Sequence, residues 1–234
     1  MKISLFFIIC LLSVKGICQK DTFLFKNQKV TIFKDSAYYK DTEIYNAAKD
    51  LKELTKQEKT DDCDVNYQFY YNPLSLVGNY YSYESGETGT IACGPPGNSL
   101  EIQTINLSNR QPVSILDIFT EKSILKALKN DNWVKKITQE YKIDLNAINS
   151  FKTFLDTINN LGSTKFSSNS FTLLSYNKQN KNASVRFVGM EYMGFNHYKH
   201  LQLGLLLEPK KAYLKLFKNK IYFTLTDYKN GLTK

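Results

Sequence analysis

The sequence is poor in the residues and motifs that most often mark an active site. It has only two histidines and one tryptophan, no CxxC pair, and no serine hydrolase signature of the GxSxG type. The GPPG run at residues 94–97 lacks the GKS or GKT ending of a phosphate-binding loop, and its prolines remove backbone donors. These absences favour a protein that is not an enzyme and that holds neither a metal nor a cofactor.

Long apolar runs are missing after the N-terminus, and no Pro-, Ser- or Gly-rich linker divides the chain. The apolar run at residues 3–14 follows a single lysine and precedes the small residues Gly16 and Cys18, a pattern typical of a secretory signal peptide. It is too short to span a bilayer comfortably. We therefore expect a signal peptide at residues 1–18, a single domain at residues 19–234, secretion or a periplasmic location, and no membrane span.

Cysteine is scarce as well. Removal of the signal peptide leaves Cys63 and Cys93, and in an oxidising compartment an even pair is most simply a disulfide. Closing a loop of about 30 residues would stabilise the fold by roughly 3 to 4 kcal/mol. A catalytic thiol or a metal site is the weaker alternative, because zinc needs three or four ligands.

Acidic residues are outnumbered by basic ones, and the formal net charge is +9. The lysines are dispersed along the chain and form no block, which is typical of a charged, soluble surface. Because export would separate the protein from most nucleic acid, we expect no nucleic-acid partner.

The order of apolar patterns predicts an α+β fold. Strand-type alternation occupies residues 21–33, 65–107, 170–176, 183–188 and 221–226, with an interruption expected at Pro73. Helical spacing occupies residues 41–57, 120–141 and 145–162, and Thr120 is placed to cap the second of these helices. Residues 201–207 fit either a strand or a helix entry. We expect an antiparallel sheet with two or three helices packed on one side.

Tyrosine is abundant, with 16 residues, and it gathers in the strands of the 65–107 region. Successive strand residues point to opposite faces, so one residue of each neighbouring pair can be exposed. Exposed tyrosines suit stacking on sugar rings or anchoring a protein interface. We expect a binding surface of Tyr80, Tyr81, Tyr83, Glu84 and Glu87. The alternative is cross-strand packing that only stabilises the sheet.

Two groups of titratable residues offer a hydrolase alternative. His197 and His200 could share a helix face with Glu191, but in a strand their odd spacing places them on opposite faces. The carboxylates Glu84, Glu87 and Asp117 could supply a glycosidase pair. Surface and capping roles are the simpler interpretation of both groups, and Asp117 suits the start of a helix.

The segment from Tyr80 to Trp133 resembles a known extracytoplasmic domain. Its strand YYSYESGETG, its strand LEIQTINLSNRQPVSILDIF and its helix EKSILKALKNDNW are similar to the C-terminal domain of the RsiV anti-sigma factor and the accessory domain of PdaC-type deacetylases, a domain of unknown function of the 3298 type. The family's turn carries Gly-Gly-Ala-His, whereas this chain has Ser-Gly-Glu-Thr-Gly at residues 85–89, whose glycines we interpret as turn residues.

The resemblance implies a non-catalytic module that works outside the cytoplasm. In one branch of the family the module recognises lysozyme, and in another it accompanies a cell-wall enzyme. The expected partner is therefore a cell-wall glycan or a lysozyme-like protein, and a purely structural accessory subunit is a further alternative.

Overall fold

The structure is a computed structural model. It describes residues 25–26, 29–33, 35–49, 51–52, 66–90, 97–194, 197–217 and 221–224. Within this part of the chain, three antiparallel sheets combine with short helices, and the predicted α+β class is confirmed. None of the helices described is long and apolar enough to cross a membrane.

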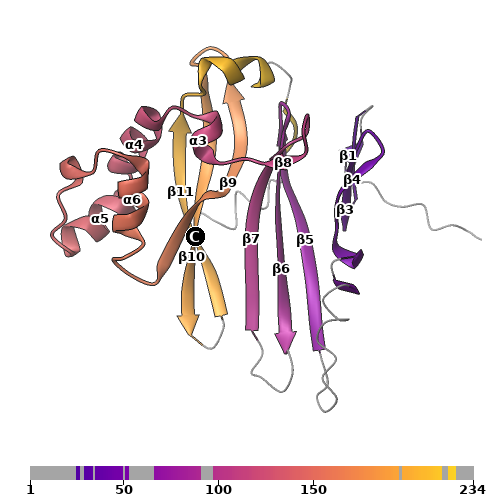
Figure 1. Ribbon diagram of the computed structural model, residues 1–234, viewed down its shortest axis with the longest axis horizontal. Helices are drawn as coiled ribbons and strands as arrows, with labels where there is room; N and C mark the ends of the chain where they lie inside the picture. The colour runs from indigo at the N-terminus through magenta and orange to yellow at the C-terminus, as the bar shows by residue number, and fades with distance from the viewer. Residues whose placement is uncertain are drawn as a thin grey trace, which may run out of the picture.

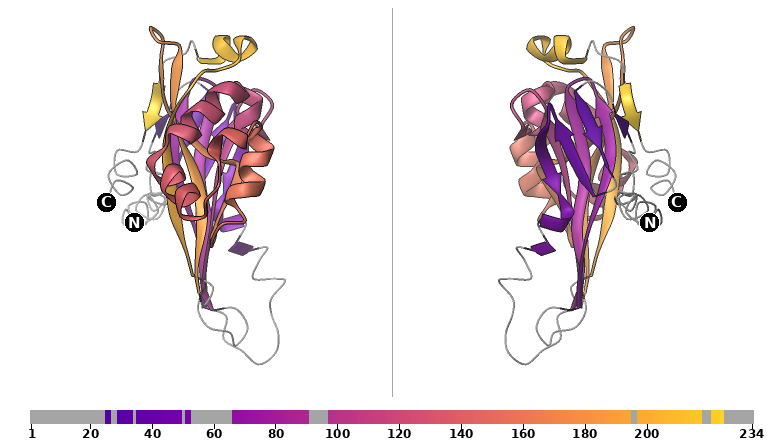
Figure 2. Two further views of the ribbon diagram at one scale, coloured as in Figure 1. Left: turned by 90° about the vertical axis from the view of Figure 1, so that its left-hand side faces the viewer. Right: turned by 90° about the vertical axis from the view of Figure 1, so that its right-hand side faces the viewer.

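Helices and sheets are stacked in layers. Figure 1 shows, from left to right, the helices, a C-terminal sheet, a central sheet and an N-terminal sheet. From one side the helices lie in front of the strands, and from the opposite side the N-terminal strands do (Figure 2). The helices are α3 (Ile115–Ile118), α4 (Glu121–Asn130), α5 (Asn132–Glu140) and α6 (Phe151–Ile158), with 3-10 turns η1 (Leu145–Ala147) and η2 (Lys211–Phe217).

The N-terminal sheet contains β1 (Phe25–Lys26), β2 (Val30–Ile32), β3 (Ser36–Tyr39) and β4 (Thr42–Asn46). The pairing of β1 with β2 confirms the strand structure predicted within residues 21–33. The predicted helix start at residue 41 is wrong, because Lys40 and Asp41 adopt positive φ angles of 47° and 60° and turn the chain into β4. Helical structure begins at Ala47, and the predicted helix beyond Lys52 lies outside the described residues.

The central sheet contains β12 (Ile221–Thr224), β5 (Asn66–Val77), β6 (Tyr80–Thr90), β7 (Gly97–Asn106) and β8 (Gln111–Pro112), in that order. The expected interruption at Pro73 is wrong: β5 continues through it with a register shift between Pro73 and Ser75. The chain turns instead at Gly78, where φ is 60°. The interpretation of Gly86 and Gly89 as turn residues is also wrong, because both lie within β6 and pair with residues of β7.

The C-terminal sheet contains β11 (His197–Leu207), β10 (Asn182–Gly194) and β9 (Thr164–Asn177). Residues 201–207 therefore form a strand. One face of this sheet packs against α4 and α6 through an apolar core that includes Ile124, Leu128, Phe151, Phe154, Phe171, Phe187, Leu203 and Leu205. The Thr120 cap is confirmed, since its hydroxyl accepts a bond from the Ser123 N–H at 3.3 Å. The predicted helix 120–141 is divided at Asp131, whose carboxylate caps α5.

Buried hydroxyl groups join the edge of β9 to the face of the central sheet. The Leu173 N–H donates to the Ser82 hydroxyl at 3.3 Å, and the Ser75 hydroxyl donates to the Leu173 carbonyl oxygen. The Thr104 hydroxyl donates to the Phe171 carbonyl oxygen at 2.5 Å and lies 2.8 Å from the Ser82 hydroxyl. Backbone groups that an edge strand would otherwise leave unpaired in the interior are thereby satisfied.

Replacing Thr104 with valine is expected to lower the free energy of unfolding by about 2 kcal/mol, because the same shape leaves the Phe171 carbonyl oxygen without its donor. Urea denaturation followed by circular dichroism measures the change. Thr88→Val is the matched control, since Thr88 lies on β6 but is exposed, and it should change stability by less than about 0.5 kcal/mol. Equal effects of the two substitutions would contradict the role of the buried hydroxyl.

Candidate binding surface

The tyrosines predicted to form a binding surface lie in the core. Tyr80 and Tyr81 are fully buried and Tyr83 is 7% exposed. The prediction of an exposed surface formed by these three rings is therefore wrong, and the cross-strand packing alternative holds. The N-terminal sheet covers Tyr81 and Tyr83: Tyr45 stacks on Tyr71 at 4.2 Å and lies 5.2 Å from Tyr83. Tyr80 points to the opposite face, where its ring lies 5.4 Å from that of Phe217.

The predicted carboxylates do not converge. Glu84 faces the C-terminal sheet, where it lies near His200. Glu87 is three residues further along β6 and points to the opposite face. Asp117 caps α3, since its carboxylate accepts a bond from the Ser114 N–H at 2.8 Å, as its place at a helix start predicts. Cys63 and Cys93 lie outside the described residues, so their disulfide stays a prediction.

An exposed aromatic cluster lies at the end of the β10–β11 hairpin, and we call it the aromatic tip. It consists of Tyr192, Met193 and Tyr198, which are 47%, 54% and 38% exposed. Tyr192 and Tyr198 are cross-strand partners, and their rings are 5.4 Å apart at an angle of 53°. Three of the five large exposed hydrophobic side chains among the described residues are therefore in one place.

The aromatic tip is held by a side chain of the central sheet. The Asn98 Oδ1 accepts a bond from the Tyr198 N–H at 2.9 Å, and its Nδ2 donates to the Tyr198 carbonyl oxygen at 3.1 Å. Gly194 follows with φ of 92° and a register shift, so the strands bend there. Asn98 is the second residue of β7, so the aromatic tip adjoins one end of the central sheet.

A carboxylate and an imidazole meet between the two sheets beside the aromatic tip. Glu84 accepts a bond from Asn72 Nδ2 at 3.1 Å, and its Oε2 lies 3.9 Å from His200 Nδ1. Burial raises the pKa of Glu84 and lowers the pKa of His200 to about 4. At neutral pH His200 is therefore uncharged, and the 3.9 Å separation is too long for a hydrogen bond.

The two histidines and Glu191 do not assemble into a catalytic or metal-binding group. His197 is exposed, and its odd spacing from His200 places it on the opposite face of β11. Glu191 pairs with Lys199 at 3.0 Å. No three His, Cys, Asp or Glu side chains in the described part of the chain gather around a point where a metal ion could bind.

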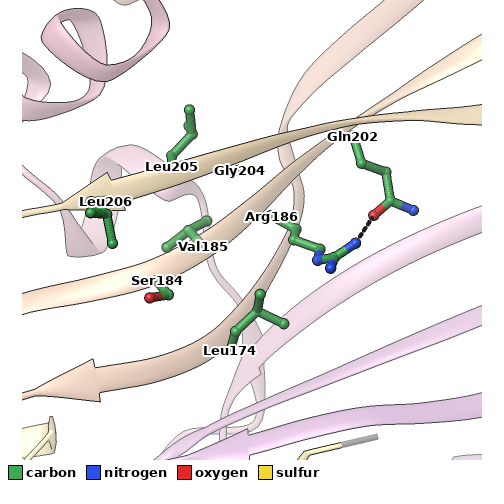
Figure 3. Close-up of a pocket in the computed structure, with 8 residues that line it drawn as sticks. All are labelled: Leu174, Ser184, Val185, Arg186, Gln202, Gly204, Leu205 and Leu206. Carbon is green, nitrogen blue, oxygen red and sulfur yellow. Dashed lines mark hydrogen bonds between the residues drawn. The ribbon is translucent and has the colours of Figure 1, made fainter. Parts of the chain in front are cut away.

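A hollow of about 330 Å³ lies on the same face of the hairpin, further from the aromatic tip. Figure 3 shows Gly204 and Leu206 of β11 along it, with Arg186 of β10 donating to the Gln202 side-chain oxygen at 2.9 Å. Leu206 is 67% exposed. The face of the hairpin that points away from the helices thus carries three features in order. These are the aromatic rings of Tyr192 and Tyr198, the His200 side chain beside Glu84, and an open apolar hollow.

Sequence reasoning missed the aromatic tip. The available signal was a pair of tyrosines flanking a glycine and an asparagine, residues typical of a hairpin turn, at 192–198. The two histidines in the same segment, three residues apart, favour a metal site as the interpretation of these residues, and the structure does not form one. Only the pairing of Tyr192 with Tyr198 shows that the two rings are neighbours.

The fold and the surface define an α+β protein of stacked antiparallel sheets with an exposed aromatic hairpin. A solved structure of a DUF3298 family member from Bacteroides fragilis is similar to this chain, with 13% sequence identity and a TM-score of 0.32. The match covers 74% of this chain and 67% of that one. The DUF3298 family is the domain family that the 80–133 segment of this chain resembles. No family model matches the chain, and no curated protein matches it.

Proposed function

We propose that the protein is a non-catalytic binding or accessory protein of the cell envelope, exported by its N-terminal signal, and that it holds a cell-wall glycan through the aromatic tip. The observation that carries this proposal is the exposed pair of Tyr192 and Tyr198 on an anchored hairpin. Apolar rings with polar hydroxyls suit the alternating CH and OH surfaces of sugars.

The geometry of the aromatic tip supports a glycan ligand. Two rings set at 53° can contact one sugar on two sides or two successive sugars of a chain. Because Asn98 fixes the Tyr198 backbone, little conformational entropy is lost when a ligand binds.

Titration of soluble peptidoglycan fragments into the purified protein, followed by tyrosine fluorescence or calorimetry, tests the proposal. Replacing both Tyr192 and Tyr198 with alanine is expected to weaken binding at least about tenfold, the loss typical of a removed aromatic anchor. Tyr141→Ala is the matched control, since Tyr141 is 49% exposed but ends α5, and it should bind as the unaltered protein does.

The same titration separates the competing functions. Binding to lysozyme but not to glycan would show that the ligand is a protein and not a glycan. Unchanged glycan binding by the double variant would show that the aromatic tip is not the binding site. Release of new sugar ends from peptidoglycan, lost in Glu84→Gln, would favour the hydrolase alternative. A protein that binds neither ligand would fit a structural subunit.

A further inference from the structure

We infer that the outer edge of β11 is a second binding site, which takes a short extended segment of a partner polypeptide as an added strand. This inference does not rest on glycan binding. The C-terminal sheet has two edges, β9 and β11. The β9 edge is satisfied by the hydroxyls of the central sheet, whereas no second described strand pairs with β11 over residues 200–206.

The hydrogen bonds at the two ends of β11 show which residues direct their backbone groups outward. Tyr198 bonds outward to Asn98. At the other end, Glu208 accepts from the Thr120 N–H at 3.0 Å and donates to the Ser123 hydroxyl at 2.8 Å. Alternate residues of an antiparallel strand face the same side, so the intervening even-numbered residues also point outward: His200, Gln202, Gly204 and Leu206.

These four residues offer an unused ladder of donors and acceptors. Across the part of the chain that the structure describes, β11 pairs with β10 alone, and the outward N–H and C=O groups of the four make no hydrogen bond. Exposed edges of this kind bind extended peptides, with affinity from the backbone and specificity from alternate side chains. Gly204 and Leu206 are exposed, so this part of the edge is open to a partner.

Gly204 is not explained by packing within the protein. A Cβ atom added there would have no heavy atom within 4 Å, and the register of β10 and β11 is regular around it. A glycine inside a regular strand typically marks a bulge or the close approach of another backbone. Since no bulge is present at this position, the close approach of a partner backbone accounts for the glycine.

Hollows lie on both sides of this edge. The 330 Å³ hollow, whose lining includes Leu174 and Leu206, lies on the face away from the helices. A second hollow, of about 700 Å³, lies between the edge and α4, where Lys122 and Lys126 line it. Alternate side chains of an added strand would enter the two hollows in turn.

Charge and polarity indicate the chemistry of the partner segment. Lys122 and Lys126 are exposed on one flank of α4 and form no ion pair with another described residue. Two carboxylates border the same hollow. The Asp131 carboxylate accepts from two backbone N–H groups of α5, and the positive end of that helix offsets its charge. Glu208 is then the one carboxylate of this hollow's described lining that faces the two lysines. The partner is therefore a segment of alternating acidic and apolar residues.

A second copy of the protein does not fit this edge. Its β11 has 11 residues, whereas the open stretch between the Asn98 contact and the start of α4 is residues 200–206. In an antiparallel pair with Leu206 opposite His200 of the copy, Tyr198 of the copy would fall where Thr120 and Ser123 already bond Glu208. A segment of about five residues avoids both ends.

The test uses the full protein labelled with ¹⁵N and the peptide acetyl-Glu-Val-Glu-Val-Glu-amide as probe. Binding should shift the amide signals of Gln202, Gly204 and Leu206. Two further peptides carry N-methyl groups on the valines or on the glutamates. Only one set of amides can face β11, so one analogue should lose binding at least about tenfold while the other keeps it. A lysine-for-glutamate peptide should also bind more weakly.

Two protein variants complete the design. Leu206→Pro removes an outward N–H without breaking the β10 ladder and should weaken the probe about tenfold, whereas Leu206→Thr retains the N–H and should bind more tightly than the proline variant. If Leu206→Pro does not fold, the comparison of the two N-methylated peptides still tests the inference. No binding at millimolar probe, equal binding of both analogues, or a dimer that Leu206→Pro dissociates would overturn the inference.

Discussion

Gly86→Ala is expected to lower the free energy of unfolding by about 3 kcal/mol, one of the two largest effects that the structure predicts. A Cβ atom at this position would lie 2.5 Å from the Tyr70 hydroxyl oxygen and even closer to the Ser99 carbonyl oxygen. The Tyr70 ring lies across Gly86, and its hydroxyl donates to Ser99 at 3.0 Å. A methyl group there must displace that ring and push β7 away from β6.

Gly204→Ala is the matched control, because Gly204 also lies within a strand but has open space around it. Alanine there should leave stability unchanged or raise it by roughly 0.5 kcal/mol, through the lower entropy of the unfolded chain. Urea denaturation of both variants gives the comparison. Similar losses at the two positions would show that the Tyr70 contact is not what makes Gly86 necessary.

Acid is expected to destabilise the protein through His200, by up to about 3 kcal/mol between pH 7 and pH 4. Burial lowers the pKa of this imidazole from 6.5 to about 4. The unfolded chain therefore takes up a proton near pH 6.5 while the folded protein does so only near pH 4. The stability that the neutral side chain contributes is complete above pH 6.5 and is lost as the pH falls toward 4.

Glu84 acts in the opposite direction, so the two groups must be separated. Burial raises the pKa of Glu84, which means that the folded protein accepts this proton more readily than the unfolded chain and gains stability as the pH falls. The difference in unfolding free energy between the unaltered protein and His200→Gln, followed from pH 8 to pH 4, isolates the histidine. We expect this difference to change by up to about 3 kcal/mol in that interval.

His197→Gln serves as the control for this series, because His197 is the other histidine and is exposed on the opposite face of β11. It should retain the pH dependence of the unaltered protein. A constant difference between the unaltered protein and His200→Gln at every pH would contradict a buried, neutral His200.

Much of the strand and helix order follows from local patterns. Thr120 and Asp117 were recognised as helix-start residues because capping depends on a few neighbouring atoms. The apolar residues of β7 change face along the strand: Ile102 faces the C-terminal sheet, whereas Ile105 faces the N-terminal sheet. That change of phase without a register shift is what a strand between two packed layers produces.

The structure differs from the sequence predictions where contacts between distant residues determine the local conformation. Residues 42–46 have helical spacing but form β4, because Tyr45 stacks on Tyr71 of the central sheet. Gly86 resembles a turn residue and lies in a strand, because Tyr70 fills the space that a side chain would occupy. In both cases a partner more than ten residues away overrides the local preference.

The sequence by itself determined the α+β class, the caps at Thr120 and Asp117 and the alternation of most strands of the central sheet, since these depend on spacing and on the chemistry of adjacent residues. Which tyrosines are exposed was decided only by the tertiary structure. Alternation places a ring on one face or the other, but the packing of a second sheet determines whether that face is buried. Tyr81 and Tyr83 are covered by the N-terminal sheet, whereas Tyr192 and Tyr198, at the end of a hairpin, remain exposed.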